Sequence, residues 1–587
     1  MQKKMYERFG EKVKAVLKYL KEYKWLLIIG PFFKLVEAVL ELFLPYFMSL
    51  AVDHGVLKED KSYVIKMGIT MLITATIGIV SALICQYTAS IVSQGFGTKL
   101  RNAMFDKIMS FSNTEIDDFG TTSLVNRLTS DVNQLQTAVA MLIRLVIRAP
   151  FLCIGGVVMA VSLDIKLSVV LMVVLPMFII VLAVTMIKTV PLYKKVQQKL
   201  DQIALVVREN LAGVRVIRAF SKVSYEEEKF ENSNEEYAKT AIRVGKISSI
   251  LNPLTNLIMN LAICAILWIG GIRVNSGSMS VGSVIAFINY VTQILAALII
   301  VSNLVVLYTK AFASLGRVAK VLNTEVSIKE GEGTKEKESD YAVEFENVTF
   351  YYEGTKEPAL TNINLKVKKG ETVGIIGGTG SGKSTLVQLI PRFYDATTGK
   401  VKVNGLDVKE YKGKELIHLI GMVPQKSVLF TGSILENLRW GDLEAKEEQV
   451  KKAAEIAQAS EFIEKMPEQY HTILTQGGTN VSGGQRQRLT IARALVKEPD
   501  ILILDDSFNA LDFVTDANLR KALHENLKGL TTFIISQRAS TIKNSDQIVV
   551  LHDGEMVGIG KHHYLMKDCE VYREICLSQE REEGGDD

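Results

Sequence analysis

The segment at residues 377–384, GGTGSGKS, holds residue types that could bind a chain of phosphate groups. Its glycines let backbone N–H groups close around phosphate oxygens, Lys383 supplies a positive charge, and the Ser384 hydroxyl could ligate magnesium. An apolar run precedes the segment and a helical run follows it, as this motif requires. The predicted phosphate-binding residues are Gly377, Gly378, Thr379, Gly380, Ser381, Gly382, Lys383, Ser384 and Thr385.

Two further segments carry polar groups that suit the same chemistry. The apolar run 501–504 ends at Asp505, whose carboxylate could contact magnesium through water. The segment 481–485, VSGGQ, places a serine hydroxyl and glycine amides before the basic helical run 486–497. The sequence therefore predicts a second phosphate-contacting element.

The elements around these segments alternate between strand-like and helical runs. From residue 342 onward, strand-like runs at 343–350, 371–376, 501–504 and 532–535 are separated by helical segments. This alternation predicts a largely parallel sheet flanked by helices. We therefore expect an α/β nucleotide-binding domain of the P-loop NTPase type at residues 342–577.

The first half of the 587-residue chain is more apolar than the second. Six stretches are each long enough to cross a hydrocarbon core, which takes about 20 helical residues. They lie at residues 25–52, 63–92, 137–162, 167–190, 249–274 and 281–308. We therefore expect an all-α, six-helix transmembrane domain at residues 25–320, embedded in the lipid bilayer.

The connections between these stretches differ in length and charge. Segments 53–62, 163–166 and 275–280 are short, whereas segments 95–136 and 191–248 are long and rich in Lys and Arg. Basic residues concentrate on the cytoplasmic side of membrane proteins. The sequence therefore predicts a multi-pass protein of the cell membrane, inner or plasma, with both termini and the nucleotide-binding domain in the cytoplasm.

Three shorter segments complete the predicted organisation. Basic residues 1–24 are predicted to form an amphipathic helix on the cytoplasmic membrane surface. Charged residues 321–341 are predicted to form a linker, and residues 578–587 a charged, disordered tail. Breaks at 117–120 and 211–213 could each reverse the chain and present a short transverse helix. The net charge of only +4 gives no case for a nucleic-acid partner.

The order of the motifs resembles that of ATP-binding-cassette (ABC) proteins. The phosphate loop is followed by Gln425 in VPQ, then by VSGGQ, then by LILDD at 502–506. In the first half, segments 120–131 (GTTSLVNRLTSD) and 209–220 (ENLAGVRVIRAF) are similar to the intracellular loops of type I (type IV fold) ABC exporters. The chain thus resembles a half-transporter of the multidrug-exporter type. This resemblance implies ATP-driven export of small amphipathic, drug- or lipid-like molecules from the cytoplasm.

The resemblance also implies roles for single residues. It implies ATP and Mg²⁺ as cofactors, with Tyr352 stacked on adenine and Tyr351 as the alternative. It implies Ser384, Gln425 and Asp505 around magnesium. Because the family pairs two such domains head to tail, the signature residues would contact ATP bound to a partner chain. These residues are Ser482, Gly483, Gly484, Gln485 and Asp512.

Two positions with a role in hydrolysis depart from the pattern of an active family member. Asp506 stands where the family has a glutamate general base, and Gln537 stands where it has a histidine that contacts the outermost phosphate. The shorter carboxylate misplaces the proton acceptor, and glutamine carries no charge. The expected result is a degenerate, poorly hydrolysing site in a heterodimer with a homologous half-transporter that carries the catalytic glutamate and histidine. The alternatives are a homodimeric exporter that uses Asp506 as a slow general base, and a regulatory ATP-binding subunit.

Charged residues also lie within the apolar stretches. Lys34, Glu37 and Glu41 occur at helical spacing in the first stretch, and Arg144 and Arg148 lie four residues apart in the third. Charges at such depth usually pair with one another or serve a function. Glu41 could attract a cationic substrate in a cavity, whereas Lys34 and Glu37 could form an ion pair within one helix.

Overall fold

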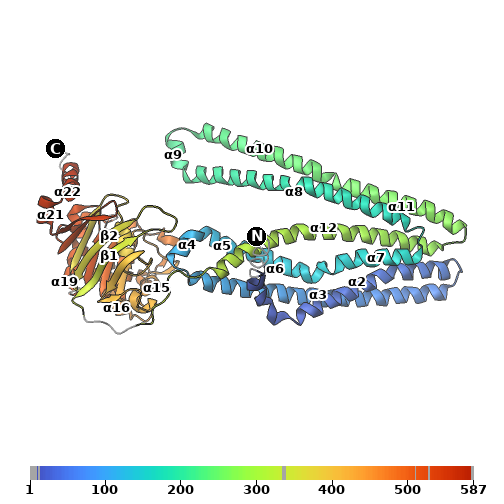
Figure 1. The fold of residues 1–587 in the computed structure, drawn as a ribbon, viewed down its shortest axis with the longest axis horizontal. Helices are drawn as coiled ribbons and strands as arrows, with labels where there is room; N and C mark the ends of the chain where they lie inside the picture. Colours follow the sequence, from blue (N-terminus) through green and yellow to red (C-terminus); the bar gives the residue numbers. More distant parts are fainter. Residues whose placement is uncertain (1–9, 11–12, 334–338, 509–510, 527–528, 584–587) are drawn as a thin grey trace. The chain divides into compact units, whose positions relative to one another are not determined.

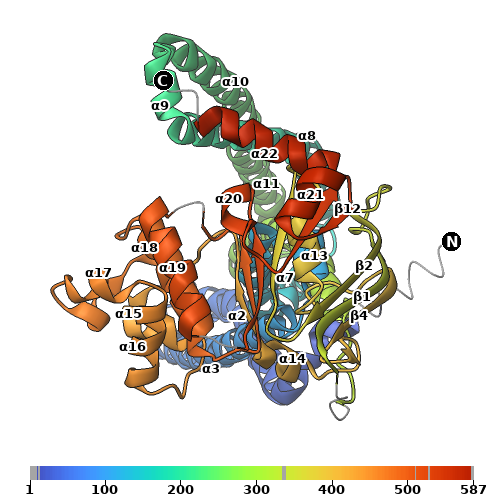
Figure 2. The ribbon, with the colours of Figure 1, turned by 90° about the vertical axis from the view of Figure 1, so that its left-hand side faces the viewer.

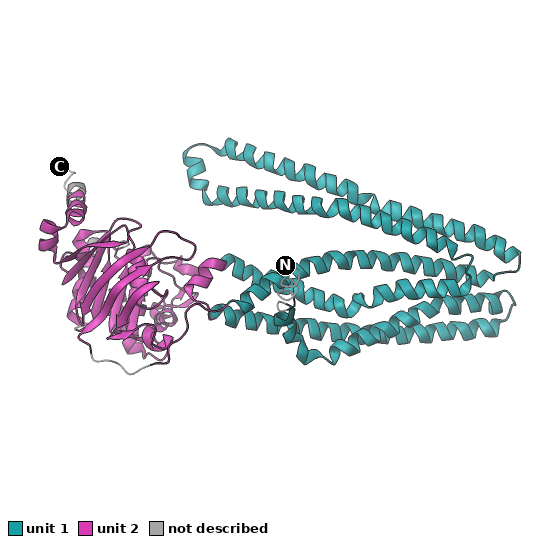
Figure 3. Ribbon diagram, in the orientation of Figure 1, with its two compact units in different colours: residues 1–109, 122–324 teal, residues 110–121, 325–587 magenta. Residues whose placement is uncertain are grey.

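The computed structural model describes residue 10 and residues 13–333, 339–508, 511–526 and 529–583. The chain divides into two compact units (Figure 3). Unit 1 holds residues 1–109 and 122–324, and unit 2 holds residues 110–121 and 325–587. The short segment 110–121 therefore packs with the second unit, although it lies in the first half of the sequence.

Unit 1 is built from long helices, because its apolar runs are interrupted by few turn-forming residues (Figure 1). Short 3₁₀ or π-helical turns (η) connect some of them. In chain order the elements are η1 (Lys18–Tyr23), α2 (Leu26–Leu50), η2 (Ala51–Val56), α3 (Lys61–Met109), α5 (Thr121–Asn126), η3 (Arg127–Asp131), α6 (Val132–Met141), η4 (Leu142–Val146), α7 (Arg148–Leu163), α8 (Val169–Ala212), α9 (Val214–Ala219), α10 (Val223–Ser249), α11 (Leu251–Asn275) and α12 (Val281–Asn323).

Five helical stretches among the described residues are long and apolar enough to cross a membrane. They are Lys61–Met109, Thr121–Leu163, Val169–Ala212, Val223–Asn275 and Val281–Asn323. The remaining predicted span is α2, which has 25 residues but contains the charged residues Lys34, Glu37 and Glu41. That α2 also crosses the membrane, as the first of six helices, therefore remains a prediction. With 49 and 43 residues, α3 and α12 are each about twice as long as the roughly 20 residues that cross a hydrocarbon core.

Each of the two predicted chain breaks lies beside a short helix. α4 (Asn113–Phe119) ends at Gly120, which has a φ of 72°. The break expected over 117–120 is confined to Gly120, because residues 117–119 belong to α4. The Glu115 carboxylate caps the start of this helix by accepting the Ser112 backbone N–H at 2.8 Å. The second short helix, α9, follows Gly213. It joins α8 to α10, and these two long helices run side by side (Figure 1).

Unit 2 contains two main sheets and one short strand pair, β7 (Gly432–Ser433) with β8 (Ile473–Leu474). One sheet is antiparallel, in the order β2 (Leu360–Lys368), β1 (Tyr341–Phe350), β4 (Thr398–Val403), β5 (Leu406–Asp407). The other has the order β12 (Glu555–Gly560), β11 (Gln547–His552), β3 (Thr372–Gly377), β10 (Thr531–Ile535), β9 (Ile501–Asp505), β6 (Ile420–Val423). Its strand pairs are parallel except for β11 with β12, so the predicted parallel sheet is confirmed. The separate antiparallel sheet was not predicted; its β1–β2 and β4–β5 pairings join neighbouring segments, and only β1 with β4 joins segments that are distant in sequence.

Helices cover both faces of the six-stranded sheet (Figure 2). Along β9, Ile503 packs in one core with Leu386 of α13 (Lys383–Gln388), whereas its neighbour Leu502 packs in another core with Leu489 of α18 (Gly483–Val496). Successive side chains of a strand point to opposite faces of a sheet. The helices α13 and α18 therefore lie on opposite sides of this sheet.

The remaining helices of unit 2 connect and flank the two sheets. They are α14 (Gly413–Leu419), α15 (Ile434–Arg439), α16 (Glu447–Ile456), α17 (Ser460–Glu464), α19 (Phe513–Asn526), α20 (Ala539–Ile542), α21 (His562–Asp568) and α22 (Glu570–Glu583), with 3₁₀ turns η5 (Gln469–His471) and η6 (Gln476–Gly478).

Several segment limits differ from the predicted ones. Helix α12 runs to Asn323 rather than to residue 320, because Val318 and Val321 are buried near its end. Strand β1 starts at Tyr341, inside the predicted linker 321–341. The tail predicted at 578–587 is helical through residue 583, and Gln579 holds it by a 2.8 Å bond from the Ala539 backbone N–H. Within the predicted N-terminal helix, residues 13–17 are α-helical and η1 follows, while residues 1–9 and 11–12 lie outside the described residues.

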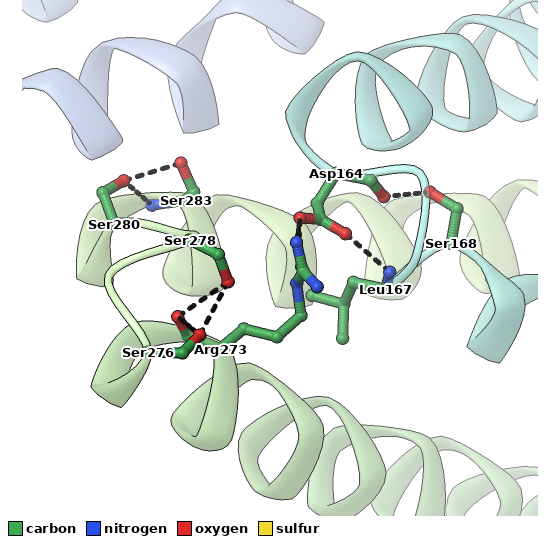
Figure 4. Close-up of polar contacts among 8 residues, drawn as sticks. All are labelled: Asp164, Leu167, Ser168, Arg273, Ser276, Ser278, Ser280 and Ser283. Atoms are coloured by element: carbon green, nitrogen blue, oxygen red, sulfur yellow. Dashed lines mark hydrogen bonds and ion pairs between the residues drawn. The ribbon is translucent and has the colours of Figure 1, made fainter.

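An ion pair joins the last turn of α11 to the short connection after α7 in unit 1 (Figure 4). Arg273 of α11 donates from Nε and Nη2 to Oδ2 of Asp164, at 3.0 and 2.6 Å. Asp164 follows α7 directly, and its Oδ1 accepts the Leu167 backbone N–H at 2.8 Å. Asp53, in the first short connection, likewise accepts the N–H of Gly282 at the start of α12, at 2.7 Å. The three connections that were predicted to share one side of the membrane therefore lie at one end of unit 1.

We expect Arg273→Met to destabilise unit 1 by about 1.5–3 kcal/mol, the usual effect of losing hydrogen bonds to a charged group. The Asp164 side chain is only 8% exposed and would lose its cation. The matched control is Lys239→Met, because Lys239 pairs with Glu235 on an exposed helix surface, where an ion pair contributes about 0–1 kcal/mol. Apparent melting temperatures of the purified variants in detergent provide the measurement. Equal melting temperatures would contradict the assigned role of the ion pair.

Candidate functional site

The predicted phosphate-binding segment forms a loop between β3 and α13. Gly382, directly before α13, has a φ of 92°, and a Cβ on it would lie 2.7 Å from the carbonyl oxygen of Ala359. Only glycine meets both conditions without strain. The Lys383 ammonium is buried and donates to the carbonyl oxygens of Gly377 at 3.0 Å and Gly378 at 2.6 Å. The loop therefore wraps its own backbone around a cation.

Two of the three residues predicted around magnesium, Ser384 and Asp505, contact each other at the base of this loop. Ser384 Oγ donates to Oδ1 of Asp505 at 2.9 Å. Burial is the main cause that raises the pKa of Asp505 and the main cause that lowers the pKa of Lys383. The attraction between the two opposite charges partly offsets both shifts. Hydroxyl and carboxylate oxygens are the ligands that magnesium prefers, so these residues fit that ion.

An aromatic cluster lies next to the phosphate-loop helix. The Tyr352 hydroxyl is 3.0 Å from Oγ1 of Thr385. The Tyr352 ring meets the Tyr394 ring edge to face, with centroids 5.4 Å apart, and the Phe350 ring at 4.9 Å. By contrast, Tyr351 is 39% exposed. Of the two candidate adenine-stacking residues, Tyr352 is therefore the one that contacts α13.

Tyr394 also contacts the segment 110–121 within unit 2. Its hydroxyl donates to Oδ2 of Asp117 in α4, at 2.8 Å. Burial raises the pKa of Tyr394, and the Asp117 carboxylate adds to this rise, so the hydroxyl keeps its proton and remains a donor. The same segment is held by Glu115, which accepts the Ser327 backbone N–H at 2.9 Å. Contacts therefore run from the phosphate-loop helix through Tyr352 and Tyr394 to α4. No sequence signal identified Tyr394, because its role depends on residues far apart in the chain.

The predicted signature segment begins helix α18. Ser482 Oγ accepts the Gln485 backbone N–H at 3.3 Å, and the Ser482 N–H donates to Oε1 of Gln485 at 2.9 Å. This reciprocal pair is a capping box, a structural role that the S-x-x-Q spacing could have indicated. Ser482 and Gly483 are exposed. The helices α13 and α18 cover opposite faces of the sheet, and among the described residues no hydrogen bond joins the signature segment to the phosphate loop.

The two departing residues lie where parallel strands end, at the same sheet edge as the phosphate loop. Asp506 follows β9 with a φ of 51°, and its backbone N–H donates to the Ile535 carbonyl at 3.1 Å. Gln425 Nε2 lies 3.5 Å from Oδ2 of Asp506. Gln537 comes shortly after β10 and is exposed. The structure thus places Gln425 beside Asp506, the residue that follows Asp505.

Two further residues have contacts that the sequence did not indicate. Asp512 precedes α19 and accepts the Thr515 backbone N–H at 2.9 Å and its hydroxyl at 2.8 Å, and these bonds lower the pKa of Asp512. This residue therefore caps a helix. Ser427, two positions after Gln425, donates to Oε1 of Gln487 in α18 at 2.6 Å. This bond links the Gln425 segment to the signature helix.

Glu41, the predicted cavity residue, does not present a lone negative charge. Its Oε2 accepts from Nη2 of Arg148 at 2.7 Å. The ion pair expected between Lys34 and Glu37 is present, with distances of 2.8 and 2.7 Å to the two carboxylate oxygens. Arg148 of α7 therefore forms an ion pair with α2. Because of this pairing, Glu41 alone would not attract a cation as an isolated carboxylate would.

Comparison with known proteins adds an independent observation. The model of the ABC transporter transmembrane region matches residues 27–298, and the ABC transporter model matches residues 360–509. An uncharacterised ABC transporter ATP-binding protein of Bacillus subtilis (strain 168) is 37% identical over 98% of this chain and 100% of its own length. An ATP-dependent lipid A-core flippase of Syntrophus aciditrophicus (strain SB) is 32% identical over 82% of this chain and 81% of its own. The structure of a bacterial Atm1-family ABC exporter with ATP bound has the same fold, with a TM-score of 0.76 and 24% identity over 96% of this chain and 99% of that one.

We expect Tyr394→Phe to loosen α4, because it removes the hydroxyl that binds Asp117 and leaves the ring in place. The bond is exposed, so its loss should cost about 1 kcal/mol and raise amide hydrogen exchange over residues 113–119 about fivefold. Tyr470→Phe is the control, since that hydroxyl contacts Ser460 elsewhere in unit 2. The role of Tyr394 would be refuted by unchanged exchange in α4.

Proposed function

Since the chain belongs to the ABC transporter family as an exporter half-transporter, we propose that it is the degenerate-site subunit of a heterodimeric exporter of small amphipathic molecules. Its own site holds ATP and hydrolyses it slowly. Its signature segment completes the hydrolysing site of the partner. ATP-driven export is the activity of the family, and the division of labour between two chains is the proposal.

The need for a second chain is supported above all by the position of α13 and α18 on opposite faces of one sheet. A nucleotide on the phosphate loop cannot also be contacted by the exposed Ser482 of the same chain. A second, homologous chain in head-to-tail orientation would supply the missing segment. The exposed start of α18 is then free to contact the partner's nucleotide.

The ATP-holding parts of this chain are complete. Lys383 and the loop amides suit the outer phosphates, and Tyr352 lies beside α13, where its ring can stack on a base. Ser384 and Asp505 would hold Mg²⁺, with Gln425 nearby, and the ion would neutralise phosphate charge. These residues support ATP binding independently of hydrolysis.

Slow hydrolysis is supported by the two departing residues. Asp506 is one methylene shorter than glutamate, and its backbone is held in a left-handed conformation by the bond to Ile535. A general base has to come within about 2.6–3.2 Å of the proton that it accepts. A displacement near 1 Å can cost about 100-fold in rate. Gln537 can donate a hydrogen bond but cannot carry charge to the outermost phosphate.

The substrate class is supported by the apolar helices of unit 1 and by one relative. Five described helices are apolar enough to lie in a membrane, so a substrate would meet mainly apolar surface. The relative from Syntrophus aciditrophicus is named as a flippase for a lipid. We therefore assign drug- or lipid-like amphiphiles to this exporter.

We expect Lys383→Ala to weaken Mg-ATP binding by the full-length chain at least tenfold, because the buried ammonium is the charge nearest the phosphate loop. Lys400→Ala, at an exposed position on β4, should bind ATP like the natural chain. A direct binding titration in detergent compares the three proteins. Equal affinity of Lys383→Ala and the natural chain would contradict the nucleotide site.

We also propose that both termini and unit 2 are cytoplasmic, with the connection after α11 outside the cell. Ser276→Cys, in a chain whose native cysteines are replaced, should react with a membrane-impermeant thiol reagent added to intact cells. Ser224→Cys in α10 should react only after the membrane is opened. Both serines are exposed, so access to the reagent decides the result. The reverse labelling pattern would overturn the orientation.

The division of labour predicts the order of two effects in the assembled pair. Ser482→Ala should lower steady-state ATP hydrolysis about 100- to 1000-fold, because it removes a phosphate donor from the hydrolysing site. Asp506→Ala should reduce turnover only modestly, since that site contributes little. If Asp506→Ala abolishes hydrolysis while Ser482→Ala is tolerated, the assignment of the two sites is reversed. Full activity of this chain without a partner would instead favour a homodimer.

A further inference from the structure

A groove of about 260 Å³ lies between α2 and α3 in the membrane unit. Glu37 and Glu41 line it from α2, Arg148 from α7, and Ala75, Gly78 and Ala82 from α3. The α3 side is open because its residues are small, and a Cβ added at Gly78 would meet nothing within 4 Å. The groove thus has a charged wall and a wall of small side chains.

The charges of this wall balance when Lys34 is included, which pairs with Glu37 but does not itself line the groove. Lys34 binds both oxygens of Glu37, and Arg148 Nη2 donates to Oε2 of Glu41 at 2.7 Å. Arg148 Nε also lies 3.8 Å from Oε1 of Glu37. Two cations therefore face two anions near the middle of α2. Adding a ligand of net charge would disturb this balance at a depth where an unbalanced charge is costly.

The charged wall nevertheless has both unused hydrogen-bond donors and an unused hydrogen-bond acceptor among the described residues. An arginine carries five N–H donors, and among the described residues Arg148 uses one of them, toward Glu41. Its Nε is buried and has no hydrogen-bond partner in the described part of the chain. Oε1 of Glu41 accepts no bond from the described residues, although the side chain is 31% exposed. A ligand could therefore find a donor group and an acceptor group next to each other.

We propose that this groove binds the headgroup of a zwitterionic amphiphile, with its anionic group on Arg148 and its ammonium on Glu41. The guanidinium fork suits phosphate or carboxylate oxygens. A headgroup with both charges leaves the net charge of the wall unchanged. The apolar chain would follow the α3 surface, where Ile79 is 62% exposed. This inference deepens the proposed export of amphiphiles and rests on it.

The first test blocks the groove without disturbing the fold. The full-length chain in detergent is labelled with a photoreactive phosphatidylethanolamine, and the cross-linked peptides are identified by mass spectrometry. Labelling is expected on residues 74–82 and should fall at least tenfold in Gly78→Leu. Gly68→Leu is the matched control, because Gly68 is a second α3 glycine whose Cβ would meet nothing within 4 Å and it does not line the groove. Equal labelling of the two variants, or no labelling of 74–82 in the natural chain, overturns the proposal.

The second test separates the two charges of the headgroup. Unlabelled phosphatidylethanolamine should compete with the probe at least tenfold better than phosphatidylglycerol, which lacks the ammonium, or an alkylammonium amphiphile, which lacks the anion. Free phosphoethanolamine should compete poorly, because it lacks the apolar chains. Equal competition by all three amphiphiles would show an apolar groove only, and equal competition by the free headgroup would show a site for a soluble zwitterion. Either result contradicts the proposal.

The third test concerns the two charged residues. Arg148→Gln and Glu41→Gln should each weaken labelling about tenfold, the effect of losing a hydrogen bond to a charged group. Phosphatidylglycerol should no longer compete with the probe in Arg148→Gln, which lacks the group that binds its anion. The alkylammonium amphiphile should no longer compete in Glu41→Gln, which lacks the group that binds its ammonium. A purely structural role would weaken all competitors alike in both variants and would overturn the assignment. Mg-ATP affinity is measured on the same preparations, so that failure of the proposed function can be told from failure of the groove proposal. Loss of ATP binding with intact lipid labelling would count against the proposed function and not against the groove.

Discussion

The alternation of buried side chains along β9 and β10 is the constraint on which the nucleotide-binding unit depends. Because neighbouring residues of a strand face opposite ways, Leu502 and Ile503 belong to different cores. The helix after the phosphate loop covers one core, and the signature helix covers the other. A shift of pairing by one residue would exchange the two faces, so the cores themselves hold the register. The separation of the two ATP-contacting elements is thus a consequence of how the sheet is buried.

The same sheet gives Asp505 and the two departing residues, Asp506 and Gln537, different surroundings. Asp505 is buried at the end of β9 and is bound by Ser384, so replacing it would disturb both packing and phosphate binding. Asp506 lies one residue beyond the strand, and Gln537 is exposed. Changes at these two positions leave the cores intact. The binding residues are therefore tied to the stability of the unit, whereas the hydrolytic positions are not.

In the membrane unit, charged residues are held in pairs, but the pairs lie in different surroundings. Arg273 and Asp164 join the last turn of α11 to the short connection after α7 at one end of the unit, and the bonds to Asp164 oxygens serve the turn after α7. Glu41 lies near the middle of the apolar helix α2 and pairs with Arg148, the first residue of α7, at a depth where a charge is costly. Among the described residues, Arg148 leaves donors unused, which is unexpected for a purely structural pair. This contrast is the reason for assigning a ligand to the second pair and a stabilising role to the first.

The sequence by itself determined the parts of this protein that depend on local chemistry. The glycines and Lys383 predicted the phosphate loop, the apolar runs predicted the long helices, and the alternating runs after residue 342 predicted the parallel sheet. Asp506 and Gln537 were visible as departures because each is a single residue within a recognisable motif.

Only the tertiary structure decided which distant residues meet. It brought Tyr394 against both Tyr352 and Asp117, placed Arg148 against Glu41, and put α13 and α18 on opposite faces. It also extended α22 through residue 583, where charge composition had indicated a tail. Local spacing specifies which contacts a helix or loop makes within itself. Contacts between elements depend on how their buried faces pack, and no single segment carries that information.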